Sequence, residues 1–418
     1  MNISSIKYVS YIFFIINSIF ASMLLHQEDS ITPFSYLYFQ IALPAIFIPL
    51  IWIKEILKYA VKDGWPLLIF LLSAGVWHLM MHGDVRVVLQ LFLFNWVLLW
   101  CGALDIRLPT IGYLVIFLGA VLVGVFSYLT TDLNVWGLFP RETGSDYPVW
   151  RVSFFPNVVL TGIFSLFAAL TVAMNRSGFW LRLFFNLLAF YFLVFSFVRT
   201  AFVSLAVFVA AVVWFSHRQT RSWVMFAVPF CLAFGIHLLI IAAPSVLVIL
   251  QDNSLISRLF LRGQTGLDAS DIFAQLSRPW IWQQHVRIFL DSSYMMGAGN
   301  FDFQRLVGHA IGGEAKAAGS ESLLTRLLAT YGLPTIMLFY FMMKSLLRLA
   351  KSRDAFGCAV FPIVIVIAMS YGSVLHPTNF LFVLYFQLMI HGRNMFAENS
   401  FSNPDQPYRP ARFWTYQH

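Results

Sequence analysis

Charged residues and cysteines are both scarce in this sequence, and each scarcity excludes a class of protein. Only 11% of the 418 residues are charged and the mean hydropathy is +0.76, whereas soluble domains carry roughly 25% charged residues. The chain is therefore neither a water-soluble enzyme nor a disordered scaffold. Cys101, Cys231 and Cys358 lie in separate apolar runs, and their odd number and spacing fit neither a disulfide framework nor a zinc site.

Nucleotide-binding and metal-binding motifs are also lacking. The sequence has no Walker A motif, HExxH, GxSxG or DxD-like pair, so nothing in it supports sugar transfer from a nucleotide-sugar with a bound divalent ion. The stretch Gly297-Ala-Gly299 resembles the opening of a dinucleotide-binding fingerprint, but it has no preceding strand and no third glycine, which favours a loop turn. A lipid diphosphate, which already carries a good leaving group, fits this inventory better; we predict no cofactor and no metal.

Apolar residues, in contrast, make up 59% of the chain and gather in runs that charged or turn-forming residues separate. A bilayer core about 30 Å thick takes roughly 20 residues per helical crossing. The sequence therefore predicts an all-α polytopic membrane protein with about twelve crossings and a single transmembrane domain over 1–418. The predicted crossings are 8–25, 34–53, 65–82, 87–104, 109–129, 157–174, 179–197, 200–215, 223–249, 323–343, 358–375 and 379–391.

The distribution of charge predicts which way these helices face. With the N-terminus inside, the inner connections carry most of the lysines and arginines, and the outer connections carry most of the acidic residues. This is the asymmetry of the positive-inside rule. The net charge of +8 is thus assigned to the cytoplasmic rim, and no nucleic-acid partner is predicted.

Two predicted outer loops, 130–156 and 250–322, are longer than connections between helices need to be, which is typical of functional loops. Within the second loop, the stretch 275–291 mixes Trp, Ile and Phe with Arg and His. It predicts an amphipathic helix lying near the outer interface, where tryptophan is favoured. The paired, broken helices of many secondary transporters are not evident.

Arginines near the outer ends of the runs are the candidate binding residues. Arg199 is a lone cation between the seventh and eighth runs, where it either faces a cavity, a partner or an anion, or snorkels to the headgroups. Arg151 lies at the mouth of the sixth run and could equally be a solvated loop residue. Arg278 begins the predicted amphipathic helix, where a cation opposes the helix dipole and a bound anion would explain it. Arg287 could assist or could pair with an acid. Guanidinium groups bind phosphate oxygens bidentately, so two or three can hold a diphosphate without metal.

Glu321, at the outer start of the tenth run, is the candidate general base. An acidic residue in a first helical turn can be purely structural, stabilised by the dipole by about 0.3–1 kcal/mol. In the functional interpretation, the dipole and nearby arginines keep the carboxylate ionised so that it can remove a proton from a hydroxyl. His285, His309 and His376 are rival bases on the same side, although each could be an ordinary hydrogen-bonded interfacial histidine.

Taken in order, these short motifs resemble the bacterial O-antigen polymerase and O-antigen ligase superfamily. The matches are Arg151 with Pro156-Asn157, Phe197-Val-Arg199-Thr-Ala201, Arg278 with Trp282 and Gly297-Ala-Gly299-Asn-Phe301, and Ser320-Glu-Ser322 with Tyr331-Gly332-Leu333. About twelve crossings, cytoplasmic termini and a large loop before the tenth helix extend the resemblance along nearly the whole chain.

The resemblance implies a GT-C-like membrane glycosyltransferase in the bacterial inner membrane, acting at the periplasmic face on undecaprenyl-diphosphate-linked oligosaccharide. Its implied partners are this lipid-linked glycan, the bilayer and a chain-length regulator protein. Arginines that match Arg199 and Arg278 bind the donor diphosphate in that family, and Asn157 is a further matching position. Ligases place a histidine about eleven residues before the Gly-Leu pair; here Glu321 holds that position, which favours a polymerase. Ligation to lipid A core and a polysaccharide-lipid flippase or transporter are the alternatives.

Overall fold

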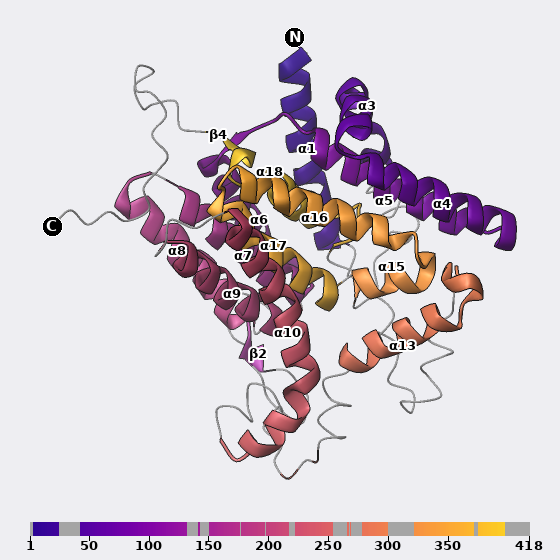
Figure 1. Cartoon of the computed structure of the whole chain (residues 1–418). Helices are drawn as coiled ribbons and strands as arrows, with labels where there is room; N and C mark the ends of the chain where they lie inside the picture. Colours follow the sequence, from indigo (N-terminus) through magenta and orange to yellow (C-terminus); the bar gives the residue numbers. More distant parts are fainter. Residues whose placement is uncertain are drawn as a thin grey trace.

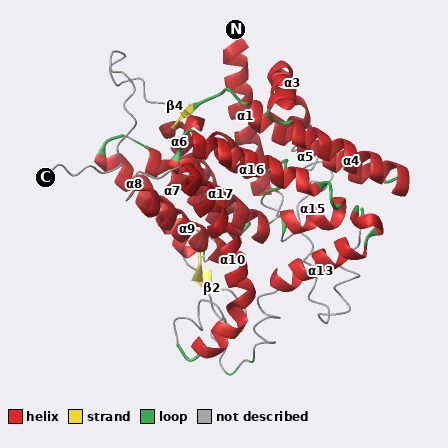
Figure 2. Cartoon of the chain, in the orientation of Figure 1, coloured by secondary structure: helices red, strands yellow, loops and turns green. Residues whose placement is uncertain are grey.

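The computed structural model describes residues 3–24, 42–131, 141–142, 150–175, 177–196, 198–216, 222–253, 266, 268, 278–299, 322–371 and 375–397. Most of these residues are helical (Figure 2). The strands in these parts have two residues each: β1 (Leu108–Pro109) pairs in parallel with β4 (Phe396–Ala397), and β2 (Arg141–Glu142) pairs antiparallel with β3 (Trp150–Arg151). The described part of the chain is therefore all-α in architecture, as the sequence predicts.

The helices follow the predicted apolar runs closely. They are α1 (Ile3–Leu24), α4 (Trp65–His82), α5 (Val85–Ala103), α6 (Thr110–Thr131), α7 (Val158–Met174), α8 (Phe179–Phe195), α9 (Arg199–Ser216), α10 (Ser222–Leu250), α17 (Ala355–Ser370) and α18 (Phe380–His391). The predicted run 34–53 is described from residue 42 and passes through a 3-10 helix, η1 (Ile48–Trp52), into α3 (Ile53–Lys62). The predicted amphipathic helix is α13 (Arg278–Asp291), which η2 (Ser293–Met295) follows.

The predicted tenth run, 323–343, is not one helix, and this part of the prediction is wrong. Two helices, α15 (Leu323–Tyr331) and α16 (Thr335–Lys351), replace it. Gly332 ends α15 with a φ of +65°, a conformation that glycine adopts without steric cost. Pro334 follows, has no backbone N–H to continue the helix, and begins the next one. The polar residues at the start of α15 therefore lie on a short helix of their own.

Apolar side chains cover both the inside and the outside of the bundle. Nearly all side chains of α7, α17 and α18 are buried, whereas large apolar side chains such as Phe13, Met80, Trp180 and Leu238 are exposed on α1, α4, α8 and α10. In Figure 1, α17 lies near the centre, with α8 and α4 at opposite sides. Soluble monomers rarely expose so much apolar surface. Among the described residues, α1, α4 and α5 are long and apolar enough to cross a membrane, so the fold is consistent with an all-α membrane protein.

The segments that the sequence assigns to the cytoplasmic side meet at one end of the bundle, where polar contacts join them. Lys7 Nζ lies 2.9 Å from Glu55 Oε1 and 3.5 Å from Asp105 Oδ2. Asp105 Oδ1 also accepts a hydrogen bond from Trp52 Nε1 at 2.9 Å. These contacts join the start of α1 to α3 and to the connection that follows α5.

The same end holds the start of α17 and the end of α18. Asp354 caps α17, accepting from the Gly357 N–H at 3.0 Å, and also accepts from the Arg393 N–H at 2.7 Å. Lys344 pairs with Asp63 at 3.3 Å. We call this the terminal end, because α1 begins and α18 ends there.

Hydrogen bonds inside the bundle join the first helix to the last. Tyr11 Oη donates to Gln387 Oε1 at 2.6 Å, and both side chains are buried. Ser18 Oγ accepts from the Phe380 N–H at 2.9 Å and donates to the Thr378 carbonyl at 3.3 Å. α1 is thus fixed against α18 along much of its length.

Candidate functional site

Arg151 and Arg199 lie at the same corner of the fold. β3 ends at Arg151, and the next residue, Val152, donates its N–H to the Phe195 carbonyl at 2.9 Å. Phe195 ends α8, and Arg199, with a half-buried side chain, begins α9. The β2–β3 register also places Arg141 opposite Arg151. Three arginine positions therefore meet where α8 turns into α9.

Close packing of α7 holds this corner in place. Asn157 caps α7, its Oδ1 accepting from the Val159 N–H at 2.9 Å, so this predicted site residue has a structural role in the described contacts. On the next turn, a Cβ at Gly162 would stand 2.7 Å from Val198 Cγ2 and 2.8 Å from Ser196 Oγ. The absence of a side chain at Gly162 thus lets the α8–α9 turn, and with it Arg199, lie directly on α7.

Arg278 begins α13, and the first turns of this helix rest on α10 and α17. Trp282, one turn after Arg278, donates its Nε1–H to the Met369 carbonyl at 2.9 Å, and its ring centroid lies 5.3 Å from that of His237 in α10. Met369 is in the last turn of α17. The start of α13 is therefore fixed at the end of α17 that lies farthest from Asp354.

The same end of α17 also receives α9. Val203, one turn after Arg199, packs against the apolar cluster that contains Val366, and Val366 lies one turn before Met369. Arg199 and Arg278 are thus each one helical turn away from residues that pack on the last two turns of α17. We call the part of the bundle that holds Arg151, Arg199 and Arg278 the arginine end. It lies opposite the terminal end along α17.

Glu321 and His309 lie outside the described residues. Ser322, which follows Glu321 in the chain, is buried; its Oγ accepts from Thr325 Oγ1 at 2.7 Å and points toward Met369 Sδ at 3.9 Å. Residue 322 therefore packs against the same turn of α17 that receives Trp282. The structure brings the beginning of α15 to the arginine end.

Two of the three histidines that are rival bases, His285 and His376, lie in the same region. His285 Nδ1 lies 2.9 Å from Thr325 Oγ1, and His376, in the connection between α17 and α18, has its Nδ1 2.8 Å from Thr378 Oγ1. Burial lowers the pKa of each imidazole to about 4, with a smaller contribution from the positive charge of Arg326. Both rings are neutral near pH 7, and both are weaker bases than an ordinary histidine.

These pKa values predict how stability changes with pH. Because the folded-state pKa values lie below the ordinary value of 6.5, the unfolded chain takes up protons first as the pH falls. Stability is therefore complete above about pH 6.5 and decreases as the pH falls toward 4. Thermal unfolding in detergent should show this loss for the wild type. His285→Gln and His376→Gln should each reduce it. An equal pH slope in all three proteins would contradict the assignment.

Arg287 is placed differently from the other arginines. Its Nε lies 3.7 Å from Asp291 Oδ2, four residues later on α13, and both side chains are largely exposed. Trp282 and His285 of the same helix are buried. Arg287 therefore belongs to a surface ion pair of the common i,i+4 kind rather than to the face that packs on α15 and α17.

The segment Gly297-Ala-Gly299 packs against Gly332 at the end of α15. Gly297, Gly299 and Gly332 have φ values of +90°, +68° and +65°, and the Gly299 N–H donates to the Thr330 carbonyl at 3.1 Å. A Cβ on Gly332 would overlap the carbonyl carbon of Met296. Gly297-Ala-Gly299 is therefore a turn docked on the end of α15, in agreement with the sequence interpretation and unlike a nucleotide-binding loop.

Gly332→Ala should destabilise the protein, because it adds both a strained positive φ and an overlap with backbone atoms that cannot rotate away. The expected cost is at least about 1–3 kcal/mol, seen as a melting temperature several degrees lower in detergent. Gly119→Ala is the control, because no atom lies within 4 Å of a Cβ there. It should be neutral or slightly stabilising. Equal melting temperatures for Gly332→Ala and the wild type would contradict this packing.

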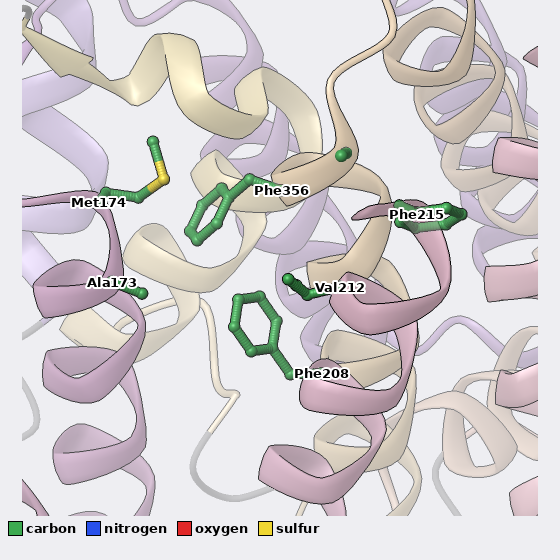
Figure 3. Close-up of a pocket in the computed structure, with 7 residues that line it drawn as sticks. Ala173, Met174, Phe208, Val212, Phe215 and Phe356 are labelled. Atoms are coloured by element: carbon green, nitrogen blue, oxygen red, sulfur yellow. The ribbon is translucent and has the colours of Figure 1, made fainter. Parts of the chain in front are cut away.

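An apolar cavity lies elsewhere in the bundle (Figure 3). It has a volume of about 100 Å³ and is lined by residues that include Met174, Phe208, Phe215 and Phe356. These residues come from the end of α7, the second half of α9 and the start of α17. The cavity is therefore near the terminal end, and its apolar lining offers no charge or donor to a diphosphate.

Arg326 is the residue of this region that the sequence analysis missed. It is the one charged residue in the predicted run 323–343, so the criterion that selected Arg199, a lone arginine at membrane depth, also selects Arg326. In the part of the chain that the structure describes, no three His, Cys, Asp or Glu side chains could together hold a metal ion. The metal-independent reaction stays a prediction.

Comparison of the chain with models of protein families, with curated proteins and with solved structures finds no match. The family resemblance therefore depends on the sequence motifs and their order.

Proposed function

We propose that this protein is a glycosyltransferase of the O-antigen polymerase type. It transfers an oligosaccharide from an undecaprenyl-diphosphate donor to a hydroxyl of a lipid-linked acceptor repeat unit. The observation that carries the proposal is the placement of Arg151, Arg199 and Arg278 at one end of α17. A diphosphate is multiply charged, and guanidinium groups are the side chains that bind it best without metal.

In this proposal the chain is a multi-pass protein of the bacterial inner membrane, GT-C-like, with about twelve crossings. The terminal end faces the cytoplasm, and the arginine end, with loops 130–156 and 250–322, faces the periplasm. Two observations support this orientation. The basic segments that the positive-inside rule assigns to the cytoplasm meet at the terminal end, and large apolar side chains are exposed between the two ends.

The proposed reaction is a single inverting displacement. Arg199 and Arg278, assisted by Arg151, bind the donor diphosphate and stabilise its charge while the bond from the anomeric carbon to the phosphate oxygen breaks. The bonding electrons leave with the lipid diphosphate, so no acid is needed. Glu321 takes the proton of the acceptor hydroxyl, whose oxygen forms the new bond on the opposite face of the sugar. The product is a glycan longer by the transferred units.

The two alternatives differ in what they require. Ligation to lipid A core uses the same donor site, but the carboxylate Glu321 at the position where ligases have a histidine favours the polymerase. A flippase or transporter would be expected to bind its substrate near the bilayer midplane. The three arginines lie at one end of α17 instead.

The glycan ladder of a deletion strain tests the proposal and separates these alternatives. Loss of a polymerase leaves single repeat units on the cell surface. Loss of a ligase leaves full-length chains on the lipid carrier and none on lipid A core. Loss of a flippase leaves lipid-linked units on the cytoplasmic side. A normal ladder in the deletion strain would refute all three functions.

A further inference from the structure

Arg326 is an exposed cation among buried neighbours at the start of α15. The residues on both sides of it, 322–325 and Leu327, are buried, whereas the Arg326 side chain is exposed. Among the described residues, no carboxylate lies within ion-pairing distance of its guanidinium. An arginine in an apolar run without a described counter-charge points to an anion that is not part of the described chain.

The hydrogen bonds around His376 give this region a second donor. The Thr378 N–H points to His376 Nδ1 at 3.5 Å, and Thr378 Oγ1 lies 2.8 Å from the same nitrogen. Because a backbone N–H can only donate, Nδ1 is the acceptor of the neutral ring, and the proton lies on Nε2. Ser322, one turn before Arg326, packs on Met369 in the last turn of α17, and His376 lies in the connection that follows this helix. The guanidinium and an imidazole N–H donor are therefore carried by segments that meet at this end of α17.

The hydrogen bonds of Thr325, the residue before Arg326, show how α15 lies relative to α13. Its neighbour Thr325 donates to Ser322 Oγ at 2.7 Å, so Thr325 Oγ1 accepts from His285 Nδ1. His285 follows Arg278 by seven residues, which is about 10 Å along a helix. α15, which carries Arg326, therefore contacts α13 about two turns beyond Arg278.

We propose that Arg326 and His376 bind a phosphate group at the arginine end. The guanidinium supplies the charge and two parallel donors, and His376 Nε2–H supplies a further donor. This inference rests on the proposed function in one respect: the phosphate is that of the lipid-linked glycan. A phospholipid headgroup presents the same chemistry and is the other source that an experiment has to separate.

The experiment uses the full-length protein in phosphatidylcholine nanodiscs, with farnesyl diphosphate as a short isoprenoid diphosphate probe. Arg326→Ala should weaken its binding about tenfold or more, the loss of one charge-assisted contact. Arg326→Lys, which keeps the charge without the fork, should bind with intermediate affinity, and His376→Phe should also bind more weakly. Arg86→Ala, an exposed arginine at the start of α5, is the matched control and should bind as the wild type does. Unchanged melting temperatures would show that the variants are folded.

A second arm repeats the titration in nanodiscs that contain phosphatidylglycerol. If this lipid competes with the probe in the wild type but not in Arg326→Ala, the bound phosphate is that of a headgroup. Equal affinity of the wild type and the folded Arg326→Ala for both ligands would overturn the proposal, even if the deletion strain shows a polymerase phenotype. Arg326-dependent binding together with a normal ladder in the deletion strain would leave this site standing and remove the polymerase function.

Discussion

Alanine at Arg199 or Arg278 is expected to abolish polymer formation while the protein stays in the membrane at normal levels. In the proposed mechanism each guanidinium supplies positive charge to a diphosphate that gains negative charge as the glycosidic bond breaks, and removing one preorganised donor of this kind costs roughly 10²–10³ in rate. Val203 and Trp282, one turn further along each helix, pack on α17 in both variants, and the amount of each variant in the membrane reports whether the fold survives. The measurement is the glycan ladder of a deletion strain that carries each variant.

Lysine variants and a distant arginine make this test specific. Arg199→Lys and Arg278→Lys keep the charge but lose the planar fork, so they should restore only part of the ladder. Arg182→Ala changes an exposed arginine on α8, far from the arginine end, and should leave the ladder intact. A full ladder from Arg199→Ala or Arg278→Ala would remove that residue from the mechanism. A requirement of the purified enzyme for magnesium or manganese would contradict the metal-independent reaction.

Glu321→Gln is expected to leave single repeat units in place of long chains. If Glu321 only stabilised the start of α15, the amide would cost at most about 1 kcal/mol of stability, and activity would be nearly normal. A general base behaves differently, because glutamine cannot accept the proton, and losing such a group costs roughly 10²–10⁴ in rate. Expression and donor binding should stay unchanged, since the proposed mechanism assigns binding of the diphosphate to the arginines.

Two further variants define what the carboxylate does. Asp291→Asn removes an exposed carboxylate of α13 that pairs with Arg287, and it should not alter the ladder. Glu321→His tests whether the position accepts the base that ligases use; partial activity would place the difference between polymerase and ligase in the acceptor groove. A near-normal ladder from Glu321→Gln would remove Glu321 from the role of base and leave His309 as the candidate.

Most helix positions could be predicted from the sequence, because each apolar run is bounded by residues that end or begin helices. Asp84, Asn157 and Asp354 accept hydrogen bonds from the first turns of α5, α7 and α17, and such side chains are recognisable caps. The break between α15 and α16 was also recognisable, since Gly332 and Pro334 are close together inside the run. Hydropathy averaged over 323–343 does not show this break, because the residues on both sides of it are apolar.

The candidate site could be predicted only in part. A lone arginine at membrane depth identifies Arg199, and the same rule applied to residues 323–343 identifies Arg326. The pairing of Arg287 with Asp291 also follows from their spacing of four on a helix. The contacts of Trp282 with Met369 and of His285 with Thr325 join residues 87 and 40 positions apart. No local pattern encodes them, because they depend on how α13 packs on α15 and α17.

The hydrogen bonds between α1 and α18 have a consequence for biosynthesis. A ribosome makes Tyr11 and Ser18 almost at the start of translation, whereas Gln387 and Phe380, their partners, come near the end. Until the last helix enters the bilayer, α1 has to keep these hydroxyl groups in lipid without those partners, at an energetic cost. A chain that stops before residue 380 therefore keeps an incompletely paired first helix and lacks the contacts that join the two ends of the sequence.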